Sequence, residues 1–345
     1  MNNDLDIFED ENILITGNIG FKGAWLSLWL DKLDAFVYGY SLNPPSNPYM
    51  FETLPEKFRK NSFYGDIRDK VRLGAIIDSV RPKFVFHLAA QPIVKRSYKE
   101  PQLTYETNFM GTMNLLECLK ESKSIESIVI VTTDKVYRNE YPYIYNEFSP
   151  LGGCDPYSAS KACTEILVET YAQYFEDKHI SLATVRSGNC LGGGDWGEDR
   201  LIPDCIRAIM SNQKIKIRNP MYIRPWQFVL ESLYGYLLVA ANFKSGAWNF
   251  GPPESDCITV LNLVKKFIQF WGKGDFEIAK DATYESRVLQ LNSGKSRDNL
   301  NWRTQYNIDK TLVKTIDWYT RYYNNPKDLY ESTMKQIGDY EELLE

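Results

Sequence analysis

The residues best suited to chemistry stand where a strongly apolar run ends. Ile128–Val131 is β-branched throughout and predicts a buried strand, and Thr132, Thr133, Asp134 and Lys135 follow it directly. These side chains place hydroxyls, a carboxylate and an ammonium next to one another, and such groups transfer protons in many enzymes. The same stretch also fits a plain strand end, in which Asp134 closes an Asx-turn and Lys135 points into solvent. The rest of the chain has to decide between the two interpretations.

A tyrosine and a lysine further along the chain form a second candidate pair. In "DPYSASKACTE", Tyr157 and Lys161 are four residues apart, so a helix would place them on one face. Asp155 and Pro156 predict the start of that helix, because aspartate caps helices and proline suits the first turn. A tyrosine accepts a proton only if its pKa of about 10 is lowered, and a neighbouring ammonium or an oxidised nicotinamide would lower it. Without such a role, a tyrosine and a lysine at this spacing simply pack together.

Three glycines predict a dinucleotide site near the start of the chain. Gly17, Gly20 and Gly23 lie between the apolar run 12–16 and a helical pattern at 21–33. Glycine there allows a tight turn, a close approach of backbone N–H groups to a pyrophosphate, and close packing of the helix on the strand.

The residues that usually separate NAD from NADP are not in their expected place. The acidic residue expected about 20 residues after the glycine turn is absent, because "YGYSLNPPS" offers only Ser41 and Asn43. No arginine follows Ser41 directly, so this stretch leaves NAD and NADP open. Asp66 is a candidate contact for the adenine, although a helix N-cap is an equally good interpretation.

The elements that must position these residues alternate between apolar runs and segments with helical periodicity. Six runs predict strands, at 12–16, 35–40, 62–67, 83–90, 127–133 and 180–187. Helical segments lie between most of them, at 69–79, 104–120 and 157–175. Nearly continuous apolar strands that alternate with helices predict a parallel sheet covered on both faces. We therefore expect an α/β fold with a Rossmann-like doubly wound parallel sheet.

The character of the chain changes after Arg186. A glycine- and aspartate-rich loop is followed by short mixed elements, with helices near 229–242, 259–271 and 310–323. We expect a dinucleotide-binding domain at 1–187 and a smaller C-terminal mixed α/β substrate domain at 188–345. A segment near 225–250 is expected to return to the first domain.

Composition argues against several classes of function. The 345-residue chain has a net charge of −5 and no cluster of lysine or arginine, which argues against nucleic acid as a partner. No apolar run reaches the ~18 residues that span a bilayer, and the acidic N-terminus lacks the apolar core of a signal peptide. Six scattered cysteines without a CxxC pair predict reduced thiols in a cytoplasmic protein. Only two histidines are present, so we expect no histidine-based metal site.

The order of these features along the chain carries a resemblance to a known family. A glycine turn, a Thr-Asp-Lys strand end and a Tyr-x-x-x-Lys helix follow one another as in extended short-chain dehydrogenases/reductases. Within that superfamily the chain resembles the CDP-glucose 4,6-dehydratases over nearly its whole length. The matching stretches are "GFKGAWLSLWL", "HLAAQPIVKRSY", "VTTDKVY", "LGGCDPYSASKACTE", "GGGDWGEDRLIPD" and "RNPMYIRPWQFVLE". The resemblance implies a nucleotide-sugar substrate and a tightly held NAD, because the cofactor is regenerated in every turnover.

The resemblance also implies roles for the strand end and the tyrosine. In the family reaction Tyr157, assisted by Thr133 and Lys161, takes the proton of the C4 hydroxyl while hydride passes to the nicotinamide. Water is then eliminated across C5–C6, and the hydride returns to C6. Asp134 would be the acid for the departing O6, and Lys135 the base at C5 or an electrostatic partner. A lysine base must be neutral, whereas an adjacent carboxylate favours the cation, so stabilisation of a C5 enolate is the alternative role.

Further residues are implied to contact ligands. Besides Tyr157 and Lys161, the implied cofactor contacts are Gly17, Gly20, Phe21, Lys22, Gly23, Asp66, Ile67, Ala89 and Ala90. Asn189, Arg218 and Arg224 would contact the nucleotide diphosphate, since guanidinium groups bind phosphate through paired hydrogen bonds. The resemblance also implies a homodimer, formed by the helix at 104–120 and the helix that carries Tyr157.

Four departures from the family pattern leave the substrate open. Ile19 stands where threonine is usual, Phe228 and Tyr284 replace histidines, and Asn292 replaces an aspartate. The last three lie in or beside the predicted sugar-nucleotide domain. Two alternatives therefore remain. One is an epimerase or dehydratase for a different nucleotide-linked sugar, and the other is a non-catalytic protein that binds NAD or a sugar nucleotide.

Overall fold

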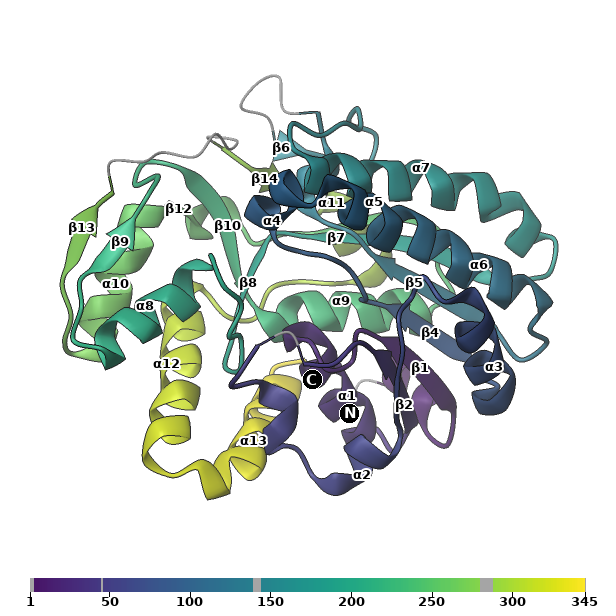
Figure 1. Ribbon diagram of the computed structural model, residues 1–345, viewed down its shortest axis with the longest axis horizontal. Coiled ribbons are helices and arrows are strands. Elements are labelled where there is room, and N and C mark those ends of the chain that lie inside the picture. Colours follow the sequence, from purple (N-terminus) through teal and green to yellow (C-terminus); the bar gives the residue numbers. More distant parts are fainter. Residues whose placement is uncertain (1–2, 45, 139–143, 280–287, 345) are drawn as a thin grey trace.

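The main sheet forms the centre of the molecule (Figure 1). The structure is a computed structural model that describes residues 3–44, 46–138, 144–279 and 288–344. The strands of the sheet are β1 Asn12–Thr16, β2 Phe36–Ser41, β3 Ser62–Tyr64, β4 Phe84–His87, β5 Ser127–Val131, β7 Ser181–Ser187 and β11 Gly246–Phe250. Within the described residues their order is β11-β7-β5-β4-β1-β2-β3, and all neighbours are parallel. All carboxyl ends therefore meet at one edge, and the predicted doubly wound sheet is confirmed.

Helices cover both faces of this sheet. They are α1 Phe21–Lys32 and α9 Val229–Ala241 on one face, and α3 Lys70–Val80, α6 Gly111–Glu121 and α7 Pro156–Glu176 on the other. Successive side chains of a strand point to opposite faces. In β1, Ile13 and Ile15 accordingly join the core under α1 and α9, and Leu14 joins the core under α3, α6 and α7. Burial on both faces explains why the strands are nearly continuously apolar.

The helix predicted at 104–120 contains one wider turn. α5 (Pro101–Tyr105) continues into a π-helical turn at Glu106–Met110 and then into α6. Asn108, inside this turn, is fully buried, and its Nδ2 donates to Ser160 Oγ in α7 at 2.9 Å. The turn thereby holds this helix against the helix that carries the predicted tyrosine.

Short elements make up the second part of the chain and the remaining connections. A mixed three-stranded sheet contains β8 Asn189–Leu191, β10 Ile223–Phe228 and β12 Cys257–Thr259. Two strand pairs are β9 Ile215–Ile217 with β13 Phe276–Ile278, and β6 Ile144–Tyr145 with β14 Gln290–Leu291. The helices are α8 Leu201–Met210, α10 Val260–Trp271, α11 Gly294–Leu300, α12 Ile308–Asn324 and α13 Leu329–Glu341. Short helices lie at Asn3–Phe8, Met50–Thr53, Asp134–Val136, Glu254–Asp256 and Pro326–Asp328, with α2 Glu56–Lys60 and α4 Val94–Lys99.

The chain crosses between the two parts of the molecule more than once. α9 and β11 belong to the layers of the main sheet and fall within the segment 225–250. At the end of the chain α13 packs on α1, where Trp29 Nε1 donates to Glu341 Oε1 at 2.8 Å. The boundary between a first domain at 1–187 and a second at 188–345 stays a prediction.

A buried carboxylate in α9 fastens the end of the chain to the main sheet. Glu231 accepts the backbone N–H of Tyr306 at 2.7 Å and the hydroxyl of Tyr340 at 2.6 Å. Burial raises the pKa of Glu231 to about 7. One side chain thus ties α9 to the segment before α12 and to α13.

Candidate active site

The glycine turn brings backbone segments too close together for side chains. Gly17 has a φ of +78°, and a Cβ there would lie 2.7 Å from the backbone N of Ala89. A Cβ on Gly23 would lie 2.2 Å from Gly17 O, whereas one on Gly20 would lie 3.3 Å from the same atom. Helix α1 begins at Phe21 without a side-chain cap, which leaves its first N–H groups for a ligand. This cradle fits the pyrophosphate of a dinucleotide.

The end of β2 carries neutral polar groups. Ser41 Oγ donates to Asn18 Oδ1 at 2.7 Å. Asp66 is bound by Arg68, whose Nη2 lies 2.7 Å from Asp66 Oδ2, and this hydrogen bonding lowers the pKa of Asp66. Helix α3 is capped by Asp69, so the alternative that Asp66 is its N-cap is wrong.

Three further residues implied to contact the cofactor lie near this turn or near α6. The backbone N–H of Ala89 donates to Thr16 Oγ1 at 3.3 Å, beside the turn. Ile67 is buried against Gly111, where an added Cβ would lie 2.5 Å from Ile67 Cγ2. Ala90 is half-buried and follows Ala89 directly.

The polar side chains that follow β5 are buried. Thr133 Oγ1 donates to Asp134 Oδ1 at 3.0 Å and accepts the backbone N–H of Lys135 at 3.4 Å. Thr133 therefore closes this turn, and Lys135 is half-buried. The alternative of a plain strand end, with an Asx-turn at Asp134 and Lys135 in open solvent, is wrong.

The environment of Asp134 favours its protonated form more than water does. Its side chain is 3% exposed, and its Oδ2 has no hydrogen-bond partner among the described residues. Burial raises the pKa of Asp134, although the ammonium of Lys135 and the hydroxyl of Thr133 lower it. A buried carboxyl oxygen without a partner is unfavourable unless a ligand satisfies it.

The cap at the start of α7 fixes the position of the predicted tyrosine. Asp155 Oδ1 accepts the backbone N–H of Ser158 at 2.9 Å, so the predicted cap is confirmed. Tyr157 then lies in the first turn of α7, where it is buried. Burial raises the pKa of Tyr157 to about 12, while the hydroxyl of Thr133 and the charge of Lys22 lower it.

Lys161 lies one helical turn further along and points to the end of β5. Its Nζ donates to Val131 O at 2.9 Å, and the residue is 4% exposed. Burial lowers the pKa of Lys161 to about 8, against the carboxylate of Glu165, which raises it. The structure therefore brings the tyrosine–lysine pair and the strand end together.

Lys22 reaches from α1 to the end of β7 and into this cluster. Its Nζ donates to Ser187 Oγ at 2.8 Å and to the hydroxyl of Tyr236 at 3.1 Å. Its pKa lies above the usual value, because the effects of Cys190 and Tyr236 outweigh burial, which lowers it. Its charge lowers the pKa of Asp134. Lys22 is thus part of the electrostatic environment of the cluster, which its predicted cofactor role did not include.

Sequence reasoning gave no role to Arg200, which also acts on the tyrosine. Burial raises the pKa of Tyr157, and the positive charge of Arg200 opposes this increase. Arg200 Nη1 lies 3.0 Å from Asp195 Oδ1, which holds the guanidinium at the start of α8. The signal in the sequence was an arginine within the glycine- and aspartate-rich loop after Arg186.

The predicted substrate contacts do not form one group. Arg224, in β10, is 4% exposed, and its charge lowers the pKa of Asp134. Asn189 begins β8, the strand beside β10. Arg218 is instead engaged in an ion pair with Asp199, with 3.0 Å between Nη1 and Oδ1. Arg224 is therefore near enough to the catalytic cluster for its charge to influence Asp134, whereas Arg218 belongs to a separate ion pair with Asp199.

Two departures from the family pattern have structural explanations. Phe228 is fully buried, with its ring centroid 5.9 Å from that of Trp25 and 5.5 Å from that of Tyr306. Asn292 Oδ1 accepts the backbone N–H two residues further on at 2.8 Å. Tyr284 lies outside the described residues. Phe228 is therefore a core residue, and its side chain changes packing rather than a substrate contact.

Other kinds of site have little support in the described residues. Among them, no cluster of three or more side chains is placed to hold a metal ion. No helix in this part of the chain is both long and apolar enough to cross a bilayer. His87 is buried between the hydroxyls of Thr16 and Thr112, and burial lowers its pKa to about 3. It is therefore neutral at physiological pH.

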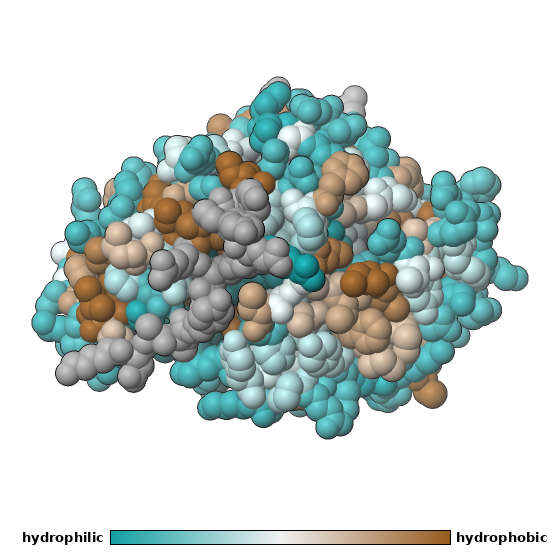
Figure 2. Space-filling model, turned by 90° about the horizontal axis from the view of Figure 1, so that it is seen from above, coloured by the Kyte–Doolittle hydropathy of each residue, from teal (hydrophilic) through white to brown (hydrophobic). Residues whose placement is uncertain are grey.

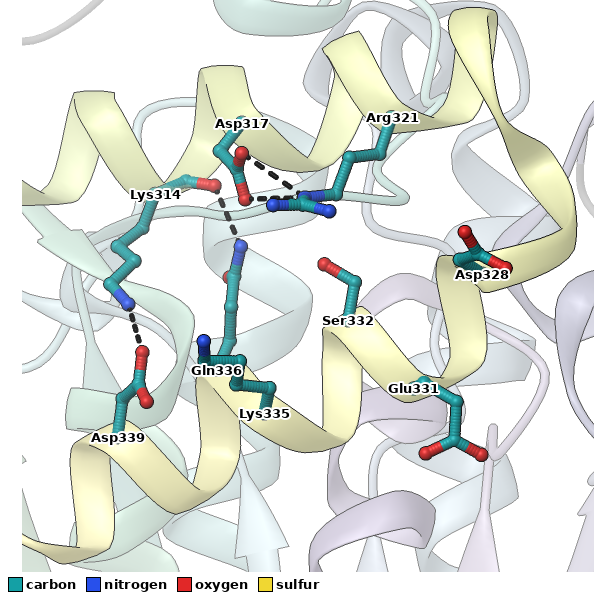
Figure 3. A pocket seen from close by; sticks show the side chains of 9 residues that line it. All are labelled: Lys314, Asp317, Arg321, Asp328, Glu331, Ser332, Lys335, Gln336 and Asp339. Carbon is teal, nitrogen blue, oxygen red and sulfur yellow. Dashed lines mark hydrogen bonds and ion pairs between the residues drawn. The ribbon is translucent and has the colours of Figure 1, made fainter.

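A groove of about 350 Å³ lies between α12 and α13 (Figure 3). Four of its charged side chains form two ion pairs: Lys314 Nζ lies 2.6 Å from Asp339 Oδ2, and Arg321 Nε lies 3.0 Å from Asp317 Oδ2. A charged ligand would have to compete with these pairs. The cluster at the end of β5 is therefore the better candidate for chemistry.

Known proteins resemble this chain over most of its length. A profile of the family described as GDP-mannose 4,6 dehydratase matches residues 14–315. The chain belongs to this family. A CDP-glucose 4,6-dehydratase of Salmonella typhimurium is 40% identical, over 98% of this chain and 98% of that protein. A dTDP-D-glucose 4,6-dehydratase of Homo sapiens is 26% identical over 92% and 93% of the two chains. The resemblance inferred from the sequence motifs is confirmed.

Solved structures share the fold. A UDP-glucose 4-epimerase of Thermotoga maritima with UDP-glucose matches with a TM-score of 0.79 at 22% identity, covering 91% of this chain and 100% of that chain. A dTDP-glucose 4,6-dehydratase of Bacillus anthracis in complex with NAD matches with a TM-score of 0.76 at 22% identity, covering 92% and 99%. At these identities the likeness concerns the fold alone.

The glycine turn generates a prediction for dinucleotide binding. Gly23→Ala places a Cβ 2.2 Å from Gly17 O, so the backbone of the turn must shift. Strain of about 1–3 kcal/mol would weaken NAD binding by roughly 5- to 150-fold. Gly74→Ala is the matched control, because its Cβ on α3 meets only an ordinary 3.5 Å contact with Cys118 Sγ, and its affinity should stay close to that of the wild type. Titration of tryptophan fluorescence with NAD measures both, and wild-type affinity in Gly23→Ala would contradict the assignment.

Proposed function

We propose that the chain is a CDP-glucose 4,6-dehydratase that uses NAD to form CDP-4-keto-6-deoxyglucose. The observation that carries this proposal is the buried cluster after β5, in which Thr133 Oγ1 donates to Asp134 Oδ1 and the same hydroxyl lowers the pKa of Tyr157. Oxidation and hydride return alone, as in an epimerase, need only the tyrosine with its lysine and hydroxyl partners. A protonated carboxyl beside a further ammonium supplies what elimination of water requires. The 40% identity to a CDP-glucose 4,6-dehydratase supports CDP-glucose as the substrate.

NAD is the dinucleotide that we propose for the glycine turn. When bound, it would supply the hydride acceptor for C4 and the hydride donor for C6. Ser41, Asn18 and Ser62 bind one another with 2.7 and 2.8 Å contacts and offer neutral groups to a ribose hydroxyl. A 2′-phosphate would favour a cation there. A related dehydratase structure is a complex with NAD, which supports the same choice.

Oxidation at C4 requires that Tyr157 accept a proton. Because burial places its pKa at about 12, positive charge must favour the phenolate. Lys22 supplies such charge, and Lys161, with a pKa of about 8, is mostly protonated at neutral pH. The C4 hydroxyl would lie between Tyr157 and Thr133, so that its proton moves to the phenolate as the hydride leaves carbon.

Elimination then removes a proton from C5 and the hydroxyl from C6. We assign Asp134 as the acid that protonates O6, because its pKa is raised by burial and its Oδ2 has no partner among the described residues. Lys135 either takes the C5 proton itself or, as a cation, stabilises the enolate while a water molecule takes that proton. The C5–H and C6–O bonds break, a C5–C6 double bond forms and water leaves. Hydride would then add to C6 and a proton would return to C5.

The nucleotide diphosphate would be held by the arginines of the second part of the chain. Arg224 and Asn189 lie on neighbouring strands, and Arg218 would have to exchange its bond to Asp199 for phosphate. Arg200 adds a further guanidinium at the start of α8. Such groups bind phosphate through charge-assisted hydrogen bonds.

A reducing compartment fits the cysteines. All six are free thiols, and Cys154 is exposed. We propose a cytoplasmic location, since an oxidising compartment favours disulfides.

The exposed apolar side chains of two helical regions support a homodimer. Tyr105 and Met110 are 37% and 40% exposed on the helix before α6, and Ile166 is 53% exposed on α7. On the face seen in Figure 2, apolar side chains gather in patches among hydrophilic ones. We propose that these helices pack against their counterparts in a second copy, which would bury this surface.

A panel of substrates tests the proposed function. The purified protein is incubated separately with CDP-, dTDP-, UDP- and GDP-glucose, and the products are analysed by mass spectrometry. We expect a product lighter by one water from CDP-glucose. Conversion of another sugar nucleotide instead would support the alternative substrate. Inactivity on all of them with retained NAD would support a non-catalytic binding protein.

Two variants should distinguish the oxidation at C4 from the elimination step that follows it. In Lys135→Ala, Tyr157 and Thr133 can still oxidise C4, whereas elimination should slow by roughly 10²–10⁴-fold. Substrate should then drive the bound cofactor into its reduced form, visible as reduced-nicotinamide absorbance. Tyr157→Phe is the control, because it blocks the first step and should give no such absorbance. Wild-type turnover of Lys135→Ala, with normal exchange of solvent deuterium into C5, would remove Lys135 from the mechanism.

The dimer is tested with a charge on its proposed interface. Ile166→Glu should convert the dimer into a monomer in light scattering at micromolar concentration, because a carboxylate would have to be desolvated in the interface. Val313→Glu is the matched control, since Val313 is 44% exposed on α12 and should leave the dimer intact. A wild-type protein that is already monomeric would refute the proposal.

A further inference from the structure

A buried ion pair joins the helix of the catalytic tyrosine to the main sheet. Glu165 of α7 and Arg186 of β7 each expose 3% of their side chains. Arg186 Nε lies 2.8 Å from Glu165 Oε1, and Nη2 lies 2.7 Å from Oε2. This is the bidentate geometry in which guanidinium and carboxylate groups bind most strongly. The reaction steps derived above use neither residue.

The carboxylate of Glu165 also holds two threonines of adjacent strands. Thr132 Oγ1 donates to Oε1 in a short hydrogen bond, and Thr184 Oγ1 donates to Oε2 at 2.6 Å. Glu165 therefore accepts four hydrogen bonds from side chains. Thr132 directly precedes Thr133 in the chain. The hydrogen bond from Thr132 to Glu165 consequently fixes the chain directly after the end of β5.

Arg186 extends the same network to the other side of the strand end. Its Nη1 donates to the hydroxyl of Tyr137 at 2.7 Å, and that hydroxyl donates to Asn249 Oδ1 of β11 at 2.7 Å. The segment 132–137 is thus held at both ends, with Asp134 and Lys135 between the two anchors. Breaking either anchor would free these two side chains to move relative to Tyr157.

Glu165 further influences the lysine one helical turn before it. Burial lowers the pKa of Lys161 to about 8, and the Glu165 carboxylate opposes this effect. Lys22 of α1 lowers the pKa of Lys161 as well, and Lys161 in turn lowers that of His87 in β4. Among these charged neighbours of Lys161, Glu165 is the anion, and it is shared with Arg186. Glu165 therefore favours the charged form of Lys161.

We propose that Glu165 is a positioning residue of the dehydratase: its carboxylate, bonded to Thr132, Thr184 and Arg186, fixes the segment 132–137 against α7. Its role in turnover rests on the proposed function, whereas its electrostatic effect on Lys161 does not. One side chain would thereby serve oxidation through Lys161 and elimination through the placement of Asp134 and Lys135.

The electrostatic part is tested without turnover. In protein labelled with ¹³Cε-lysine, the Lys161 resonance, assigned with Lys161→Arg, should titrate near pH 8. Glu165→Gln should move this titration to lower pH, because an anion that favours the ammonium is lost. Glu231→Gln is the matched control, since it removes another buried carboxylate that is not a cause of the Lys161 shift. An unchanged Lys161 titration in Glu165→Gln would overturn the electrostatic role of Glu165.

A second variant keeps the test independent of folding. Glu165→Gln leaves Arg186 buried and incompletely paired, which can unfold the protein. The double variant Glu165→Gln/Arg186→Gln removes both charges, and replacing a whole buried pair costs far less than breaking it. The Lys161 titration should again move to lower pH. Wild-type titration in the double variant would show that the pair has no electrostatic effect on Lys161.

The positioning part is tested by the pH profile of kcat/KM on CDP-glucose. Activity needs the Lys161 ammonium, so it is lost as pH rises through the pKa of Lys161, and Glu165→Gln should shift this alkaline limb to lower pH. Glu165→Asp keeps the charge but shortens the side chain, so kcat should fall at least tenfold with the limb unchanged. Wild-type kcat in Glu165→Asp would overturn the positioning role. If the wild type converts no sugar nucleotide, the proposed function fails, and the Lys161 titration still decides whether Glu165 acts on Lys161.

Discussion

The hydroxyl of Thr133 joins the two halves of the proposed reaction. It donates to Asp134 and lowers the pKa of Tyr157, so the acid proposed for elimination and the base proposed for oxidation share one neighbour. A sugar hydroxyl that binds between Tyr157 and Thr133 would contact both side chains. The geometry of the whole cluster therefore depends on where the chain places residue 133.

Burial then sets the protonation states around this hydroxyl. It raises the pKa of Asp134 and of Tyr157 and lowers that of Lys161, so it favours the neutral form of each group. A neutral aspartic acid suits the departure of O6, whereas a neutral tyrosine does not suit proton abstraction. Positive charge from Lys22 and Arg200 opposes burial at Tyr157 in part, and the pKa remains at about 12. The cluster thus combines one group that profits from burial with another that needs nearby cations.

Local signals explain why much of the site could be predicted from the sequence. The apolar run before Thr132, the Asp155 cap and the glycine turn each act within a few residues, and the structure has these elements where they were expected. The wrong alternative for Asp66 arose because two aspartates, Asp66 and Asp69, precede the same helix. Spacing alone does not show which of them caps it.

Contacts between distant residues could not be predicted in this way. Lys22 meets Tyr236 and Glu165 meets Arg186 only because α1, α7, α9 and β7 are packed together. The burial of Phe228 between Trp25 and Tyr306 likewise depends on elements from three parts of the chain. A glutamate in a helix and an arginine in a strand are common, and neither residue type signals a buried pair. The sequence therefore predicts the groups that react better than those that hold them in place.

The central claim is that oxidation, elimination and hydride return occur at one site without release of an intermediate. The most direct measurement uses CDP-glucose that carries deuterium at C4, with the product analysed by mass spectrometry and NMR spectroscopy. The account predicts that the deuterium is recovered at C6 of the 4-keto-6-deoxy product, because the abstracted hydride returns to the same molecule. A product that lacks deuterium at C6, with the label in solvent or in released cofactor, would contradict it.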